Sequence, residues 1–287
     1  MQTIHPLADM TRWSNEIIAG SRTIALVPTM GYFHEGHLSL MRLAKRLADR
    51  VVVSLFVNSL QFGPSEDFSR YPRDLARDSR MAADEKVDVL FVPTDREMYN
   101  SDFNALARVD GITDTLCGKK RPGHFEGVTT VVAKLFNIVK PHIAIFGQKD
   151  FQQLSVIRKM VRDLNWDIEI IGHPIVREEN GLAMSSRNTY LSREEREKSL
   201  CLYTAIQHAK TRFRNGLTDA ELLKSEIHDI ILTYSGVSID YISLVDKDNL
   251  SDLKEIDSNS VLALAVKVGK IRLIDNCFLG RDTEISN

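Results

Sequence analysis

Two short segments of the chain carry histidines, hydroxyls and a guanidinium in arrangements suited to binding an anion. The first, Met30–His37, follows an apolar run and passes through Gly31 into a helix-like run. A strand, a glycine turn and a helix N-terminus direct main-chain N–H groups and the helix dipole at one point, which favours a negative charge there. His34 and His37 fall on one face of the first helical turn, where both can donate to the same phosphate.

The second segment, Met184–Asn188, places two hydroxyls and a guanidinium on the consecutive residues Ser185, Ser186 and Arg187. This set suits a polyphosphate tail, because each of these groups can donate to phosphate oxygens. Together the two segments indicate a nucleotide triphosphate that is bound from two sides.

A third polar segment follows the apolar run 143–146 and begins at Gly147. Lys149 can place a compact cation beside a phosphate whose negative charge grows during displacement. Asp150 is either part of the site or an ordinary helix N-cap, and the sequence leaves this open. Gln153 faces the same way three residues later and can bind a hydroxyl or a carboxylate.

Two further segments are candidates with an equally simple structural explanation. Asn58 and Gln61 follow another apolar run and offer neutral donors and acceptors for a small polar substrate, although their spacing alone favours an ordinary polar loop. The glycine-rich basic segment 121–130 is either a mobile wall over the site or a structural connector. No serine, cysteine or histidine set has the context of an activated nucleophile, so covalent catalysis is not expected.

The elements that must position these residues alternate along the first two thirds of the chain. Strands nearly all apolar on both faces predict a parallel sheet that is covered by helices on both sides, a Rossmann-like doubly wound α/β fold. Ligands of this fold class bind beyond the carboxyl ends of the strands, where three of the polar segments lie. The expected strands are 23–27, 51–57, 87–92, 143–146 and 168–171, and the expected helices are 38–48, 75–84, 128–139 and 152–164.

The pattern changes near Leu182, which predicts a catalytic domain over residues 1–184 and a smaller α+β domain over 185–287 that closes over the site. Ser192 and Glu195 have the spacing of a capping box at the start of a long polar helix that runs to about Arg214. A second helix is expected over 217–234. Three strands follow at 241–245, 261–268 and 271–274, with a tight turn at 269–270.

Composition limits the partners and the compartment. The 287 residues carry a formal net charge of −2 with a pI near 6.5, so nothing attracts the whole chain to nucleic acid or to an anionic membrane. Cys117, Cys201 and Cys277 have neither metal-ligand nor redox spacing, which favours reduced thiols. The first residues include charged side chains and resemble neither a signal peptide nor a membrane span, so a cytoplasmic protein is expected.

Six motifs, taken in order, closely resemble those of the pantoate–β-alanine ligase (pantothenate synthetase) family. Each motif is weak alone, whereas the ordered set is specific. The resemblance runs from about residue 20 to residue 191 and returns at 272–276. The motifs are Pro28–Gly31 with His34–His37, Phe56–Asn58 with Gln61–Phe62, Tyr71–Arg73, Arg121–Phe125, Phe146–Asp150 with Gln152–Gln153, and Met184–Asn188.

The resemblance implies that ATP converts (R)-pantoate to a bound pantoyl adenylate, which β-alanine attacks to give pantothenate and AMP. It implies that His34, His37 and Lys149 are catalytic, that Gln61 and Gln153 bind pantoate, and that Gln61 also faces β-alanine. It further implies a homodimer and Mg²⁺ held largely by phosphate oxygens, with Asp78 as the candidate protein ligand. The ATP-binding residues by resemblance are Met30, Gly31, Tyr32, Phe33, His34, Glu35, Gly36, His37, Gly147, Gln148, Lys149, Asp150, Val176, Met184, Ser185, Ser186 and Arg187.

The chain departs from the family pattern at two positions. Ser59 stands where the family usually has proline, which removes a fixed φ and predicts a less preorganised loop before Gln61. Gln148 stands where the family often has glutamate, which removes a negative charge beside the phosphates. Neither change removes a group with an assigned role.

Two other functions remain as alternatives from the sequence. The pair of phosphate motifs also resembles those of class I aminoacyl-tRNA synthetases and related nucleotidyltransferases, so one alternative is such an enzyme acting on a phosphorylated small molecule. The other is a tRNA-binding synthetase fragment or a nucleotide sensor. The acidic pI, the lack of a basic patch and the short C-terminal part argue against the second.

Overall fold

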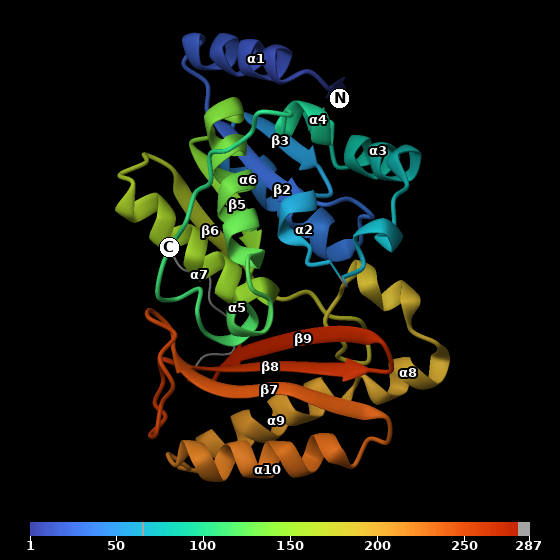
Figure 1. The fold of residues 1–287 in the computed structure, drawn as a ribbon, viewed down its shortest axis with the longest axis vertical. Helices are drawn as coiled ribbons and strands as arrows, with labels where there is room; N and C mark the ends of the chain where they lie inside the picture. Colours follow the sequence, from blue (N-terminus) through green and yellow to red (C-terminus); the bar gives the residue numbers. More distant parts are fainter. Residues whose placement is uncertain (65, 281–287) are drawn as a thin grey trace. The chain divides into compact units, whose positions relative to one another are not determined.

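The apolar runs of the first two thirds form one parallel sheet in the computed structural model, which describes residues 1–64 and 66–280. All five neighbouring pairs are parallel, and the strand order is β1-β4-β3-β2-β5-β6, of which Figure 1 labels the run from β3 to β6. The strands are β1 Gln2–Ile4, β2 Ile24–Thr29, β3 Arg50–Leu55, β4 Val89–Phe91, β5 Ile143–Gly147 and β6 Glu169–His173.

Helices cover both faces of this sheet. Helix α2 packs against β2, β3 and β5 with α3 beside it, whereas α1 packs against β2 and α6. The residues of β2 from Ile24 to Val27 are buried, as an inner strand of a doubly wound sheet requires. The helices are α1 Leu7–Ala19, α2 Glu35–Leu47, α3 Leu75–Asp84, α4 Asp95–Met98, α5 Leu116–Lys120, α6 His124–Val139 and α7 Phe151–Asp163.

The direction of winding reverses between β2 and β5. From β2 the chain adds β3 and then β4 on one side, and it returns to place β5 and β6 on the other side. In open α/β sheets the crevice at such a reversal, outside the carboxyl ends of the strands, is where ligands bind. The segment Met30–His37 follows β2 directly, and Gly147 is the last residue of β5.

The remaining third forms an antiparallel sheet of three strands in the order β7-β8-β9, with α9 and α10 packed against it (Figure 1). Its core joins the inner faces of both helices to β8, as in Ala205, Ile227 and Leu264. The elements are α8 Arg193–Lys198, α9 Cys201–Arg214, α10 Ala220–Leu232, β7 Val237–Asp246, β8 Ser260–Val268 and β9 Ile271–Phe278. The predicted α/β class with a smaller α+β part is confirmed.

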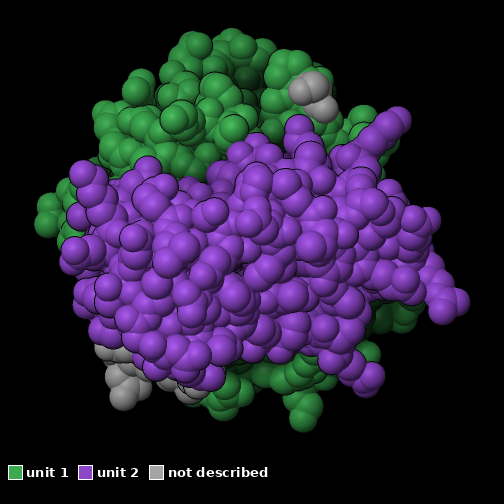
Figure 2. Space-filling model, turned by 90° about the horizontal axis from the view of Figure 1, so that it is seen from below, with its two compact units in different colours: residues 1–147, 153–173 green, residues 148–152, 174–287 purple. Residues whose placement is uncertain are grey.

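Local packing divides the described chain into two compact units, coloured separately in Figure 2. Unit 1 comprises Met1–Gly147 and Gln153–His173, and unit 2 comprises Gln148–Gln152 with the chain from Pro174 onward. The domain division at residue 184 stays a prediction. In the described part of the chain, no helix combines the length and apolar content that a membrane crossing needs.

The structure corrects three details of the expected elements. The long helix from residue 192 is two helices, α8 ending at Lys198 and α9 beginning at Cys201, and the Ser199 hydroxyl between them donates to the Glu195 carbonyl at 2.7 Å. Strand β1 and helix α1 precede the first expected element. Strands β7 and β9 each extend four residues beyond one expected end, β7 beginning at Val237 and β9 ending at Phe278.

Candidate active site

The loop after β2 turns through two successive left-handed residues. Gly31 has φ 84° and Tyr32 has φ 52°, a conformation that costs a non-glycine residue about 1 kcal/mol or more. A carboxylate holds this turn, because the Tyr32 N–H donates to Asp78 Oδ2 at 2.6 Å and the Phe33 N–H donates to Asp78 Oδ1 at 2.8 Å. The buried ring of Phe33 anchors the end of the turn in the core. The loop conformation is thus imposed from α3.

Asp78 and its neighbour Arg77 act on this loop together. Burial raises the pKa of Asp78, against the opposing effect of the two main-chain donors and Arg77. Arg77 donates to the Phe33 carbonyl at 2.8 Å, and its guanidinium lies 5.0 Å from the centre of the Tyr32 ring. Each oxygen of Asp78 therefore already accepts a main-chain N–H, which gives this carboxylate a structural role in the loop.

Main-chain N–H groups fix the tautomers of the two histidines at the start of α2. His34 is the N-cap, and its Nδ1 accepts from the Gly36 N–H at 3.1 Å. The His34 N–H in turn donates to His37 Nδ1 at 3.3 Å, and the ring centres are 4.1 Å apart. Because both Nδ1 atoms accept, each neutral ring carries its proton on Nε2. Both histidines are thus N–H donors at a helix N-terminus, as phosphate binding requires.

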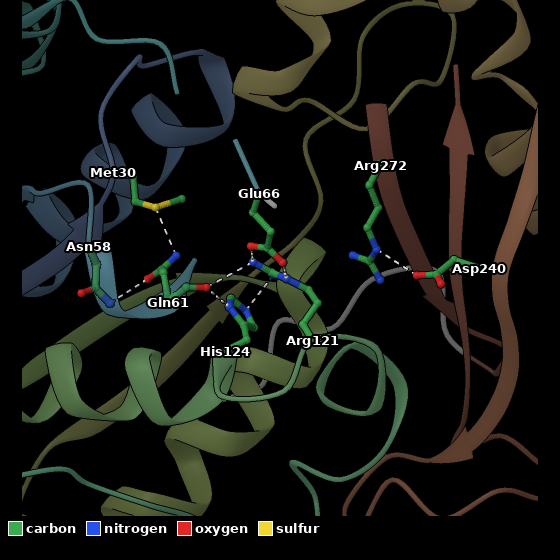
Figure 3. Close-up of polar contacts among 8 residues, drawn as sticks. All are labelled: Met30, Asn58, Gln61, Glu66, Arg121, His124, Asp240 and Arg272. Carbon is green, nitrogen blue, oxygen red and sulfur yellow. Dashed lines mark hydrogen bonds and ion pairs between the residues drawn. The ribbon is translucent and has the colours of Figure 1, made fainter. Parts of the chain in front are cut away.

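Gln61 has a single amide orientation, imposed by Asn58. Asn58 Nδ2 donates to Gln61 Oε1 at 3.1 Å and to the Gly127 carbonyl at 3.0 Å. The Gln61 Nε2 group points to Met30 Sδ at 3.2 Å, which joins this side chain to the loop after β2 (Figure 3). The oxygen of Gln61 is thus turned to Asn58, and its N–H₂ end is the end available for substrate oxygens.

Gln61 belongs to the short 3-10 helix η1, Ser59–Gln61, and Gly127 of α6 packs directly against the main chain of this helix. A Cβ on Gly127 would lie 2.4 Å from the Leu60 carbonyl oxygen and 2.6 Å from the Gln61 nitrogen. Real Cβ atoms do not approach main-chain atoms so closely, so glycine is required here. The sequence marked this glycine only as part of a glycine-rich segment.

The main-chain carbonyl of Gln61 is held by the segment whose role the sequence left open. His124 Nδ1 donates to it at 2.9 Å, and Arg121 Nη2 reaches it at 3.4 Å. Arg121 also forms two hydrogen bonds to Glu66, at 2.7 and 2.5 Å, and donates to His124 Nε2 at 2.9 Å (Figure 3). These contacts favour a structural connector that braces Gln61.

Unit 2 holds the other predicted phosphate residues. Lys149 lies in the 3-10 helix η3, Gln148–Asp150, and the side chain of Asn276 donates to the carbonyls of Gln148 and Lys149 at 3.0 and 2.9 Å. Asp150 ends η3 and directly precedes α7. The buried side chain of Asn276 on β9 therefore holds the main chain that carries Lys149.

The structure brings Val176 and Met184 together, because the Met184 N–H donates to the Val176 carbonyl at 2.9 Å. Ser185 then caps the 3-10 helix η4, Ser186–Tyr190, by accepting from the Arg187 N–H at 3.3 Å. The neighbouring Arg177 forms a bidentate ion pair with buried Asp275 of β9, at 2.6 and 2.9 Å. Strand β9 thus supports both predicted phosphate segments of unit 2.

The remaining predicted residues have these places. Gln153 lies on α7 in unit 1, whereas Lys149 and Met184–Arg187 lie in unit 2. Glu66 was not singled out from the sequence, whereas Asp275 and Asn276 lie in the segment 272–276, where the resemblance returns but no role was assigned. Within residues 1–64 and 66–280, no group of three or more histidine, cysteine, aspartate or glutamate side chains could hold a metal ion.

A doubly wound parallel sheet with an anion-binding helix N-terminus after β2 places the chain among nucleotide-binding α/β proteins. The family model for pantoate-beta-alanine ligase matches residues 2–278. The pantothenate synthetase of Heliobacterium modesticaldum is 52% identical over 276 residues, 96% of this chain and 98% of the relative. The chain belongs to the pantoate–β-alanine ligase family.

Two solved structures agree with this membership. The pantothenate synthetase of Thermus thermophilus has a TM-score of 0.92 and 42% identity, covering 97% of this chain and 99% of its own. The pantoate-beta-alanine ligase of Francisella tularensis, described as complexed with beta-gamma ATP and beta-alanine, has a TM-score of 0.82 and 33% identity, covering 98% of each chain. The alternative of a nucleotidyltransferase acting on a phosphorylated substrate is not favoured by these matches.

The close approach of α6 to η1 predicts the effect of Gly127→Ala. The added methyl group must displace the main chain of Leu60 and Gln61, and overpacking of this kind costs about 1–3 kcal/mol. We expect a lower free energy of unfolding by denaturant titration, and a raised KM for pantoate. Gly63→Ala is the matched control, because its Cβ would meet nothing closer than 3.8 Å. Equal stability of both variants would contradict the close packing.

The ion pair of Glu66 with Arg121 predicts a pH dependence of stability. Burial would raise the pKa of Glu66, but Arg121 outweighs it and the pKa lies below its ordinary value of 4.5. The ion pair therefore stabilises the folded state above pH 4.5. This stabilisation is lost as the pH falls through the lower pKa that Glu66 has in the folded protein. Glu66→Gln should lower the melting temperature at pH 7 and converge with wild type in acid. Glu255→Gln, at an exposed position, is the control, and its melting temperature should match that of wild type at every pH. A difference in melting temperature between Glu66→Gln and wild type that persists in acid would contradict a role for the ion pair.

Proposed function

We propose that this chain joins pantoate to β-alanine in two steps, with ATP as the activating substrate. One observation carries the proposal: Met30, at the start of the phosphate-binding loop, contacts the amide of Gln61, so a nucleotide-binding segment and a substrate-binding side chain adjoin in unit 1. Membership of the pantoate–β-alanine ligase family supplies the substrates of the proposed reaction.

In the first step, a carboxylate oxygen of pantoate attacks the α-phosphorus of ATP. A P–O bond forms, and the bond to pyrophosphate breaks with its electron pair on the leaving group. The Nε2–H groups of His34 and His37 donate to phosphate oxygens, and the Lys149 ammonium stabilises the charge at the α-phosphate. We assign contacts with the rest of ATP to Gly147, Gln148, Asp150, Val176, Met184, Ser185, Ser186 and Arg187, as the resemblance implies.

In the second step, the amine of β-alanine attacks the carbonyl carbon of the pantoyl adenylate. A C–N bond forms, the C–O bond to AMP breaks, and the amine loses a proton. Gln61 presents N–H donors to pantoate and faces β-alanine, while Gln153 contributes a second neutral amide. No covalent enzyme intermediate is required, because positioning and charge stabilisation suffice for acyl transfer from an adenylate.

Mg²⁺ is the expected companion of ATP, and it neutralises charge on the phosphate oxygens when bound. The residues fit an ion held by phosphate oxygens and water better than one held by Asp78. Both oxygens of Asp78 accept main-chain N–H groups of the turn after β2, so coordination would compete with the bonds that hold the loop. Asp78 as a ligand stays a prediction.

The resemblance also supports a homodimer, and the composition supports a cytoplasmic protein. We propose both on these grounds, together with the three buried cysteines, whose reduced state agrees with a reducing compartment. Light scattering of the purified chain measures its oligomeric state directly.

A substrate-omission assay tests the proposed function. Enzyme with Mg-ATP, pantoate and β-alanine should release AMP and pantothenate in equal amounts, and omission of pantoate should abolish AMP release. AMP release that ignores pantoate but needs a phosphorylated small molecule would support the nucleotidyltransferase alternative and overturn the proposal.

The charge on Lys149 gives a sharper prediction. Lys149→Ala should reduce kcat by about a hundredfold or more, because a cation that stabilises charge in the transition state is lost. Its main chain should stay in place, since Asn276 binds the carbonyl and not the side chain. Lys247→Ala, which removes a lysine from the same unit, should keep the wild-type rate. A near-normal kcat for Lys149→Ala would exclude this lysine from the chemistry.

A further inference from the structure

Two residues around the short helix α4 contact the start of η1, although neither belongs to the predicted site. The Tyr99 hydroxyl donates to Asn58 Oδ1 at 2.6 Å, and the Ser59 hydroxyl donates to Asp95 Oδ1 at 2.6 Å. Asp95 is the first residue of α4, and Tyr99 is the residue that ends it. The two residues that precede Leu60 are thus each bonded to the same short segment.

Tyr99 donates to Asn58 Oδ1, which also accepts from the Leu60 N–H, a main-chain group that can only donate. The ring of Tyr99 lies between Phe56, at 6.1 Å between ring centres, and Phe103, at 5.0 Å. Burial raises the pKa of Tyr99, so the hydroxyl keeps its proton over the working pH range. Asn58 Oδ1 is therefore an acceptor in a fixed place.

The orientation of Asn58, which the Leu60 N–H and the Gly127 carbonyl fix and Tyr99 supports, determines which end of Gln61 faces the substrate. With Oδ1 of Asn58 turned to Tyr99 and the Leu60 N–H, its Nδ2 must face Gln61, and Gln61 Oε1 must accept from it. If Asn58 turned over, two oxygens would meet and Gln61 would turn as well. Gln61 would then offer an acceptor to the oxygens of the substrate, which carry the same sign of partial charge.

The contact of Ser59 with Asp95 replaces a constraint that proline would supply. Proline fixes φ without any partner, whereas serine leaves the φ of this position free. The bond to Asp95 ties the serine to α4 instead, and the carboxylate is itself favoured at a helix N-terminus. The sequence predicted a less preorganised loop at Ser59, and this hydrogen bond offsets part of that loss.

We propose that Tyr99 and Asp95 are positioning residues for substrate binding: Tyr99 holds the amide of Asn58, and through it the donor end of Gln61, and Asp95 fixes the start of η1 through Ser59. This inference rests on the proposed role of Gln61 in binding pantoate. Tyr99 and Asp95 contact Asn58 and Ser59, and their effect on the reaction passes through Gln61 alone.

Steady-state kinetics of Tyr99→Phe tests the first part. The variant removes one oxygen and leaves Asn58 Oδ1 with a weaker set of donors, so the KM for pantoate should rise about tenfold. The KM for ATP and kcat at saturating pantoate should stay within about twofold, since the phosphate loop is held by Asp78. Tyr234→Phe, which removes a hydroxyl in unit 2, is the matched control and should leave all three constants unchanged.

Rescue tests the second part. Asp95→Ala should raise the KM for pantoate about threefold, as the loss of an exposed hydrogen bond predicts, whereas Asp95→Asn keeps an acceptor and should match wild type. In a Ser59→Pro background, Asp95→Ala should have no further effect, because proline restricts φ without a partner. A threefold rise in that background would overturn the role of Asp95.

Gln61→Ala separates this inference from the proposed function. A raised KM for pantoate in Gln61→Ala with an unchanged KM in Tyr99→Phe would overturn the positioning role and leave the proposed site intact. An unchanged KM in Gln61→Ala would overturn both. Equal rises in the KM for pantoate and for ATP in Tyr99→Phe would identify a general loss of structure and overturn the inference.

Discussion

The buried amide of Asn58 is the contact on which the substrate side of unit 1 depends. Its oxygen accepts from Tyr99 and Leu60, and its nitrogen donates to Gln61 and the Gly127 carbonyl. A buried amide with these partners has one stable orientation, because turning it over would break the bonds to the Leu60 N–H and the Gly127 carbonyl, at a cost of about 1–3 kcal/mol per unsatisfied group. The donor end of Gln61 follows from that orientation.

Asp78 has the corresponding structural role in the loop after β2, which is the predicted nucleotide-binding loop. Strands β2 and β3 are neighbours, with Thr29 opposite Leu55, so the loops that leave them start side by side. A buried carboxylate holds the first loop and a buried amide holds the second, and the contact of Met30 with Gln61 joins them. Rigid main chain at two adjacent strand ends is what an enzyme needs when positioning is its main contribution to the rate.

Much of this arrangement follows from local pattern. The parallel sheet, α3 with the expected bounds, and the histidines at the start of α2 are set by apolar runs and neighbouring residues. The contacts that orient the site are not local: Tyr99 lies 41 residues and Gly127 69 residues from Asn58. The pattern of a single sequence does not show which residues far apart along the chain are neighbours in the folded protein. The break at Ser199 was missed because a hydroxyl that bonds to its own helix does not alter the polar pattern of that helix.

The central claim is that ATP is used to activate the carboxylate of pantoate, and isotope transfer tests it most directly. Pantoate labelled with ¹⁸O in its carboxylate should be turned over with Mg-ATP and β-alanine, and the AMP analysed by mass spectrometry. Attack of a carboxylate oxygen on the α-phosphorus, followed by cleavage of the C–O bond, leaves one labelled oxygen in each AMP. The account predicts AMP heavier by one ¹⁸O, and unlabelled AMP formed together with pantothenate would contradict it.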